Sequence, residues 1–191
     1  MSYQTQPVRL IGGRLCLDFL NTADWSARGD VVHEKLTGPK DLAIWCRAVS
    51  LGKRPDLDDP AAMGELKAFR ASLRWLFLAA ISGEKPKKSD LIRFNQVLDF
   101  RTPLAPLAVR RGAFAYSKDL SVAQTVGLSA LATLTLPQEI ERVEICPSKD
   151  CGWLFLDESK NRRRRWCAME TCGNRAKARR HYQRQIEGGL E

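Results

Sequence analysis

Histidine is almost missing from this sequence: only His33 and His181 occur among its 191 residues. Because histidine is the side chain that most often transfers protons in enzymes, few residues are available here for histidine-dependent catalysis. The chain also lacks the GxSxG, P-loop, HExxH and GxGxxG motifs, each of which fixes catalytic or phosphate-binding groups at set positions. We therefore expect that the protein is not an enzyme.

Long apolar runs are absent as well. No window of about 18 apolar residues could form a membrane span, and the first residues, MSYQTQPVRLIGG, contain no apolar run of signal-peptide length. We therefore expect a cytoplasmic protein without membrane contact, whose cysteine thiols stay reduced. The apolar fraction of 44% is ordinary for a globular protein, so a core can form without disulfides.

Positive charge, in contrast, is abundant and unevenly distributed. The chain has 31 Lys and Arg against 22 Asp and Glu, a formal net charge of +9. Between residues 160 and 184, ten basic residues face a single acidic one, Glu170. Such a density disfavours a compact unit through self-repulsion and indicates a polyanionic partner.

The first two-thirds of the chain predict helices. Apolar residues recur at intervals of three and four, the spacing of one helix face, within 39–51, 60–82, 89–102 and 121–136. Asp59 would cap the longest of these helices and Pro60 would open it. We expect the buried faces of the first three to consist of Leu42, Trp45, Cys46 and Val49, of Leu66, Phe69, Leu73, Leu76 and Ala80, and of Leu91, Phe94 and Leu98.

Two short runs around Arg111–Gly112, in LAVRRGAFAYSK, predict a β-hairpin. The composition changes near residues 137–142, so we expect a mostly helical domain over residues 1–139 and a smaller unit over 140–191. The expected fold class is mainly α, with enough strand to be called α+β.

The segment LCLDFLNTADW, residues 15–25, is compatible with a strand or a helix. It places the polar residues Asp18 and Asn21 among apolar ones and close to Trp25, which makes the three a candidate pocket for a small-molecule effector. Capping and turn hydrogen bonds account for the polar residues at least as well. Cys16 and Cys46 each stand alone in an apolar pattern, and we expect both in the core.

The other four cysteines form two C-x4-C pairs, CPSKDC and CAMETC, separated by 15 residues. Four thiolates on two short loops suit a tetrahedral Zn²⁺ site, although two disulfides or four buried thiols are alternatives. Zinc is favoured because we expect a reducing compartment. The predicted metal ligands are Cys146, Cys151, Cys167 and Cys172.

The order of segments around these cysteines is typical of a treble-clef or ribbon-like zinc finger. RVEI predicts a strand that delivers Cys146, and WLFLDESKNRRRRW predicts a hairpin in which the arginine run returns as an exposed strand. A helix then begins at the last ligand, with Ala178, Tyr182 and Ile186 as its buried face. Gly173 and Asn174 would tolerate the positive φ of a metal loop.

Arginine side chains on such a helix would face solvent and could bind phosphates. Arg175 stands in the first helical turn, where the macrodipole disfavours a cation, so a zinc thiolate, Asp157 or a phosphate should compensate it. A solvated charged surface is the alternative for the whole set. The candidate nucleic-acid contacts are Arg162, Arg163, Arg164, Arg165, Arg175, Lys177, Arg179, Arg180 and Arg184.

The stretch CPSKDCGWLFLDESKNRRRRWCAMETCGNRAKARRHYQR resembles the CGNR-type zinc finger, named for the tetrapeptide Cys172-Gly173-Asn174-Arg175. Upstream, GGRLCLDFLNTADWSARG and DLAIWCRAVSLG resemble the ABATE domain that usually precedes this finger. The resemblance covers essentially the whole chain. It implies a bacterial, stress-induced transcription regulator whose finger contacts DNA.

We therefore expect a regulator that binds DNA through a structural zinc finger, with an N-terminal domain that senses an effector or forms a homodimer. A zinc-stabilised protein–protein interaction module, docking an acidic protein or the chain's own N-terminal domain, is the alternative. RNA is a weaker third partner, because few exposed aromatic residues are expected for base stacking.

Overall fold

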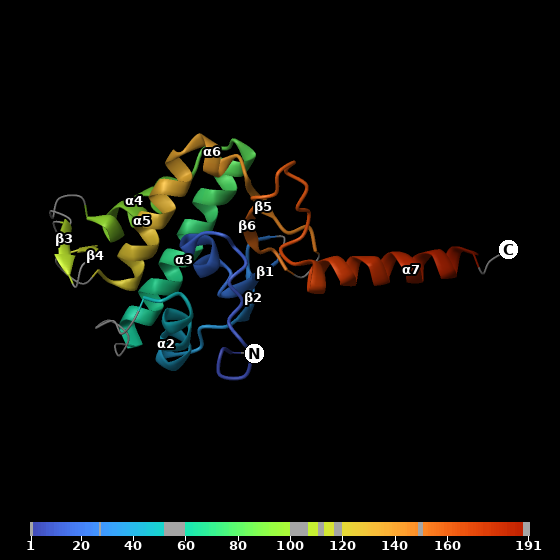
Figure 1. Cartoon of the computed structure of the whole chain (residues 1–191), viewed down its shortest axis with the longest axis horizontal. Helices are drawn as coiled ribbons and strands as arrows, with labels where there is room; N and C mark the ends of the chain where they lie inside the picture. The colour runs from blue at the N-terminus through green and yellow to red at the C-terminus, as the bar shows by residue number, and fades with distance from the viewer. Residues whose placement is uncertain are drawn as a thin grey trace.

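The computed structural model describes residues 2–26, 28–51, 60–99, 107–110, 113–116, 120–148 and 151–188. As the sequence predicts, this part of the chain is mainly helical with small hairpins, and one helix extends away from the body (Figure 1). The elements are α1 (Leu15–Leu20), β1 (Ala23–Trp25), β2 (Val31–Glu34), α2 (Pro39–Ala48), α3 (Pro60–Ser82), α4 (Lys88–Leu98), β3 (Leu107–Arg110), β4 (Ala113–Tyr116), α5 (Val122–Thr135), α6 (Pro137–Ile140), β5 (Val143–Ile145), β6 (Leu154–Leu156), the π-helical turn η2 (Met169–Gly173) and α7 (Asn174–Gly188).

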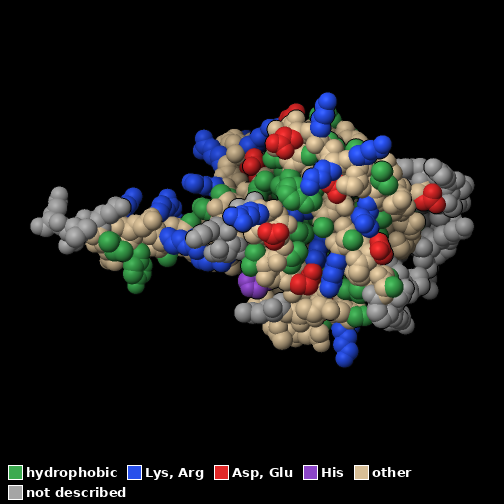
Figure 2. Space-filling view, turned by 180° about the vertical axis from the view of Figure 1, so that it is seen from behind, with side chains coloured by type: hydrophobic (Ala, Val, Ile, Leu, Met, Phe, Trp, Pro, Cys, Tyr) green, Lys and Arg blue, Asp and Glu red, His purple; other side chains and the backbone are tan. Residues whose placement is uncertain are grey.

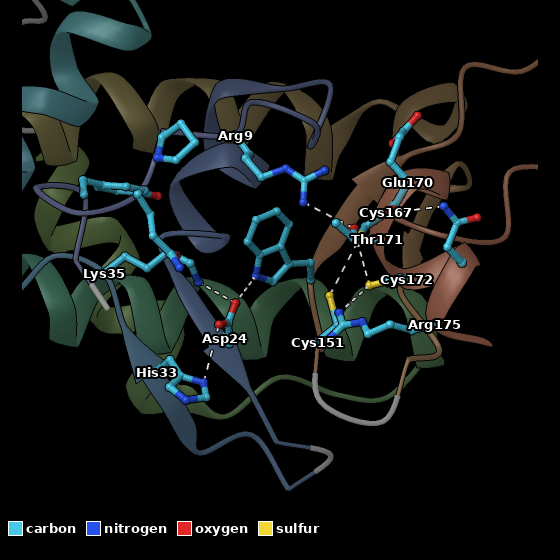
Figure 3. A pocket seen from close by; sticks show the side chains of 15 residues that line it. Arg9, Asp24, His33, Lys35, Cys151, Cys167, Glu170, Thr171, Cys172 and Arg175 are labelled. Carbon is cyan, nitrogen blue, oxygen red and sulfur yellow. Dashed lines mark hydrogen bonds and ion pairs between the residues drawn. The ribbon is translucent and has the colours of Figure 1, made fainter. Parts of the chain in front are cut away.

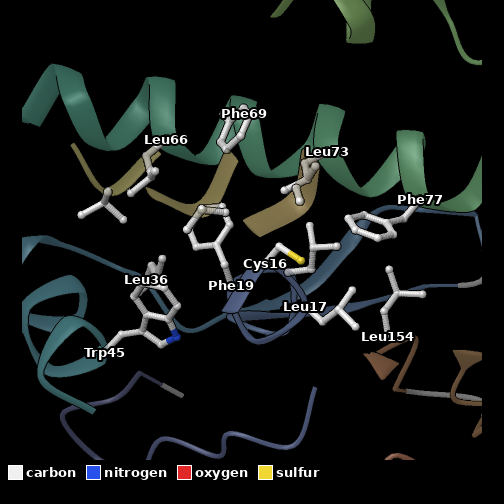
Figure 4. Packing of buried hydrophobic residues seen from close by; sticks show 14 of the residues in the cluster. Cys16, Leu17, Phe19, Leu36, Trp45, Leu66, Phe69, Leu73, Phe77 and Leu154 are labelled. Atoms are coloured by element: carbon white, nitrogen blue, oxygen red, sulfur yellow. The ribbon is translucent and has the colours of Figure 1, made fainter. Parts of the chain in front are cut away.

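Helix α3 is the centre of the body, and α1, α4 and α5 pack against it. Its predicted stripe is buried from Leu66 to Leu76, and Phe69 stacks on Phe19 of α1 (Figure 4). The prediction fails at Ala80, which is exposed, because Phe77 continues the face instead. The predicted cap at Asp59 lies outside the described residues.

The remaining predicted helices form, with one wrong assignment. Helix α2 buries Leu42, Trp45 and Cys46 as expected. Helix α4 buries Phe94 and Leu98, but Leu91 is 41% exposed, so its assignment to the core is wrong. Asp90, in the first turn where the helix dipole favours a carboxylate, lies on the buried side of α4 instead.

The ambiguous segment near the N-terminus is helical over α1. Cys16 in this helix and Cys46 in α2 are both fully buried, which confirms that they are core residues. The segment then turns into β1, which pairs antiparallel with β2. His33 therefore lies in a strand.

The hairpin predicted around residues 107–116 is present, with β3 and β4 antiparallel. Its turn at Arg111–Gly112 lies outside the described residues. Within the part of the chain that the structure describes, no helix is both long and apolar enough to cross a bilayer.

Strand β5 carries the predicted RVEI segment and pairs antiparallel with β6. The hairpin predicted between β6 and the arginine run is therefore wrong: residues 162–165 form no strand. Both faces of β6 are buried. Leu154 and Leu156 belong to the core of the helical body, whereas Phe155 packs with the four clustered cysteines. The domain boundary at 139/140 stays a prediction. The apolar side chains of β6 pack into two cores, that of the helical body and that around the cysteines.

Candidate metal centre

The four predicted ligands come together in one buried cluster. Their sulfur atoms all lie within 4.8 Å of one another, with 3.5 Å between Cys151 and Cys167 and 3.6 Å between Cys167 and Cys172. A tetrahedral site with metal–sulfur bonds of about 2.3 Å has sulfur–sulfur edges of about 3.8 Å. All four are free thiols, so the two-disulfide alternative is excluded. The donor set and its dimensions fit a tetrahedral thiolate-bound metal ion.

The thiols need a cation to ionise together. Hydrogen bonds from Cys151 and Cys167 lower the pKa of Cys146, and the hydrogen bond with Cys146 raises the pKa values of Cys151 and Cys167. One thiolate therefore makes it harder for its neighbours to ionise, since like charges in a buried site disfavour each other. A bound metal ion would remove this penalty.

The first metal loop (residues 146–153) contacts β1 at Cys151 and Gly152. The backbone N–H of Trp25 donates to the carbonyl of Cys151 at 3.2 Å. Gly152 has a φ of +59°, and a Cβ at this position would lie 2.6 Å from the carbonyl oxygen of Trp25. Glycine is therefore required here both for its conformation and for the close approach of two backbones.

The second metal loop ends in η2, which supplies Cys172 just before α7 begins. The predicted positive φ at Gly173 and Asn174 is wrong, because Asn174 has a φ of −67° and Gly173 is not among the positive-φ residues. Gly173 serves close packing instead: a Cβ there would meet the sulfur of Met169 at 2.4 Å and Trp166 at 3.3 Å.

Arg164 points inward and fastens the metal loops to the N-terminal segment. Its guanidinium donates to the carbonyls of Ile11 at 2.8 Å and Cys167 at 2.6 Å, and it lies 4.4 Å from the ring centre of Phe155. The prediction that it extends an exposed basic stripe does not fit this geometry. Arg162, Arg163 and Arg165 are exposed.

Helix α7 is the largest departure from expectation. Its predicted buried face is exposed, with Tyr182 at 70% and Ile186 at 64%, because the helix extends away from the body (Figure 1). Basic and hydrophobic side chains both line it (Figure 2). Lys177, Arg179, Arg180, Arg184 and His181 are all exposed, as predicted for the basic face.

Arg175 has one of its three predicted partners. Its guanidinium donates to the sulfur of Cys172 at 3.2 Å. A cation beside a metal thiolate favours the ionised sulfur. Arg175 therefore belongs to the metal centre as much as to the basic face.

The three residues predicted to form an effector pocket have structural partners. Asp18 accepts from the backbone N–H of Gly12 at 2.8 Å, and burial raises its pKa to about 6. Asn21 pairs with both backbone groups of Leu154, and the indole of Trp25 donates to a carbonyl of α1. The polar groups of these residues therefore make structural hydrogen bonds within the fold, which is the alternative given above to an effector pocket.

A cavity of about 600 Å³ instead lies beside the metal loops (Figure 3). It is open to solvent on one side and is lined by the N-terminal segment, the β1–β2 hairpin and both metal loops, including the predicted ligands Cys151, Cys167 and Cys172. Sequence patterns did not indicate it, because its lining residues are far apart in the chain. Those with acidic or basic side chains are Arg9, Asp24, His33, Lys35, Glu170 and Arg175.

Two buried cations of the helical body face the first metal loop. Arg74 of α3 is 3% exposed, donates to the carbonyl of Gly152 at 2.8 Å and stacks on Trp25. Burial lowers its pKa to about 10, which the negative charge of Cys151 opposes. Lys35 is similarly buried and lies over the ring of Trp153. Arg74 thus supplies positive charge toward the thiolates, whereas the charge of Lys35 is balanced by its ion pair with Asp24.

Fold and site together define a mainly helical domain joined to a four-cysteine finger. The family model described as "CGNR zinc finger" matches residues 142–185. The ABATE model, described as "Putative stress-induced transcription regulator", matches residues 13–137. The chain therefore belongs to the ABATE family and carries a CGNR zinc finger. No curated protein matches the chain.

Proposed function

We propose that the four-cysteine site binds Zn²⁺ and that its role is structural. Four thiolates close the coordination sphere, whereas catalytic zinc sites keep a position open for water or substrate. The ion would tie the two metal loops together and contribute folding energy. This supports a protein that is not an enzyme.

We further propose that the protein regulates transcription by binding DNA through a basic surface made of α7 and the exposed arginines that precede it. The observation that carries this proposal is that helix α7 projects from the body (Figure 1) and that its basic side chains are exposed. Arginine forks bind phosphates well, and such contacts position a protein on a duplex. The proposed contacts are Arg162, Arg163, Arg165, Lys177, Arg179, Arg180 and Arg184.

A titration of the zinc-loaded chain with a fluorescent DNA duplex at several salt concentrations tests this proposal. Affinity should fall steeply as salt rises, and Arg180→Gln and Arg184→Gln should each reduce the slope of log K against log salt by about one. Arg47→Gln, an exposed arginine on α2, is the matched control and should leave the slope unchanged. The proposal would be refuted if the affinity did not change with salt concentration, or if all variants had the same slope of log K against log salt.

One observation favours the alternative, a protein interaction module. Exposed aromatic and aliphatic side chains on one helix are a common docking surface, and Tyr182 and Ile186 lie four residues apart on α7. Light scattering of wild type and a Tyr182→Ser/Ile186→Ser variant checks whether a second copy docks there. If DNA binding is the function, this double variant should keep its salt slope.

A further inference from the structure

The cavity beside the metal loops has the size and composition of a small-molecule site. Its volume of about 600 Å³ falls within the usual range for ligand pockets, about 300–1,000 Å³. Three separate parts of the chain line it, as Figure 3 shows: the N-terminal segment, the β1–β2 hairpin and the finger. A pocket formed between a folded domain and a finger is a common place for ligands, since such sites favour interfaces.

Arg9 is the side chain in this cavity that most needs an anion. It is half-buried, and its guanidinium donates to the hydroxyl of Thr171 at 3.3 Å. Among the described residues, no carboxylate lies within ion-pair distance of Arg9. A neutral hydroxyl does not offset a guanidinium charge, whereas a carboxylate or phosphate would bind it with two parallel hydrogen bonds.

The acidic residue deepest in the cavity is already engaged. Asp24 pairs with Lys35, accepts a hydrogen bond from the indole of Trp153 at 2.7 Å, and lies 3.6 Å from His33. These contacts use both of its oxygens, so its carboxylate is held on the hairpin side of the cavity (Figure 3). Asp24 therefore fixes the position of the Trp153 ring through the indole hydrogen bond. It does not pair with Arg9, so an anionic ligand could.

Part of the wall is apolar. Trp153 is 7% exposed and Tyr3 is 8% exposed, and Pro7 lies on the same cavity. Flat rings favour a flat apolar body stacked or packed against them. We propose that this cavity binds a small organic oxyanion, with its carboxylate or phosphate on Arg9 and a flat apolar body against Trp153.

The position of this site gives a ligand access to the finger. Thr171 lies between Cys167 and Cys172 in the second metal loop, directly before α7. A ligand on Arg9 would thus contact both the N-terminal segment and the root of the projecting helix. The proposed binding does not depend on whether α7 binds DNA.

The test uses the zinc-loaded full-length chain, labelled with ¹⁵N, and two probes, benzoate and phenyl phosphate. Benzamide is the neutral control of the same shape. We expect the indole resonance of Trp153, the amide of Thr171 and the Nε–H resonance of Arg9 to shift and saturate with at least one anion but not with benzamide. Comparing the dissociation constants of benzoate and phenyl phosphate shows whether the site prefers a carboxylate or a phosphate group.

Arg9→Gln should raise the dissociation constant at least tenfold, while Arg47→Gln should leave it unchanged. Thermal unfolding and zinc content check that Arg9→Gln is folded. If that variant loses zinc, the Arg9 Nε–H shift in the wild type decides the question alone. The proposal is overturned if neither anion causes saturable shifts, if benzamide acts equally, or if folded Arg9→Gln binds as well as wild type.

Discussion

Asn21 is expected to join the helical body to the finger, so its truncation should affect both. The side chain is 1% exposed, donates to the carbonyl of Leu154 at 2.8 Å and accepts from the N–H of Leu154 at 3.0 Å. Asn21→Ala would leave both of these buried backbone groups without a partner. An unsatisfied buried polar group costs about 1–3 kcal/mol, so we expect a loss of about 2–6 kcal/mol. That is a large part of the roughly 5–15 kcal/mol that holds a typical domain folded.

The loss should extend to the metal site because β6 continues from the first metal loop. The backbone N–H of Cys146 donates to the carbonyl of Trp153 at 2.8 Å, one residue before Leu154. A loosened β6 would therefore loosen this contact. The assays are urea unfolding of the zinc-loaded chain and the rate at which a chelator removes zinc, which should rise in Asn21→Ala.

Asn95→Ala is the matched control, since Asn95 is exposed on α4. It should change stability by no more than about 0.5 kcal/mol and leave zinc release unchanged. Asn21→Asp keeps an acceptor for the Leu154 N–H but places a buried carboxylate oxygen against the Leu154 carbonyl, so at neutral pH it should cost at least as much as Asn21→Ala. A cost below about 1 kcal/mol for Asn21→Ala, with normal zinc release, would refute this account of Asn21.

Gly152→Ala should cost about 2–5 kcal/mol and speed zinc release, since it adds positive-φ strain to a 2.6 Å approach to the backbone of Trp25. Gly64→Ala, with open space around its Cβ in α3, should instead stabilise by about 1 kcal/mol in the same urea assay; equal effects would contradict the reasoning. Asp18 has a folded-state pKa raised to about 6 by burial, so its carboxyl favours the folded state at low pH and loses this contribution as pH rises through 6. Relative to Asp18→Asn, wild type should therefore lose about 1.4 kcal/mol between pH 5 and 7.5, and a pH-independent difference between their urea unfolding free energies would contradict it.

The parts of the structure that the sequence predicts are those fixed by local signals. The spacing of the cysteines marks the metal site, because each pair sits on a short loop and four such thiols suit a tetrahedral metal ion. The length and periodicity of 60–82 mark α3, because its apolar stripe is long enough to be unambiguous. Even in this helix, the sequence does not show that Phe77 rather than Ala80 is buried, because this depends on which elements pack against the helix.

The missed features depend on partners that lie far away in the sequence. The apolar spacing of Ala178, Tyr182 and Ile186 is that of a buried helix face, and nothing in the sequence says that no part of the body reaches it. The DESKN turn favours a hairpin between β6 and the arginine run. In the structure β6 pairs with β5 instead, and the first metal loop connects the two strands. Nor does a run of four arginines reveal that Arg164 alone turns inward onto Phe155.

The two metal loops are held in different ways, and this difference indicates how the proposed ligand would act. The first loop is fixed to the helical body by backbone contact at Gly152 and by the buried Arg74. The second loop meets the N-terminal segment through Arg164 and through the hydrogen bond between the side chains of Arg9 and Thr171. A ligand that binds the remaining N–H donors of Arg9 would lie next to this hydrogen bond with Thr171. We therefore expect ligand binding to change the second loop and the base of α7, while the first loop and the metal ligands Cys146 and Cys151 stay in place.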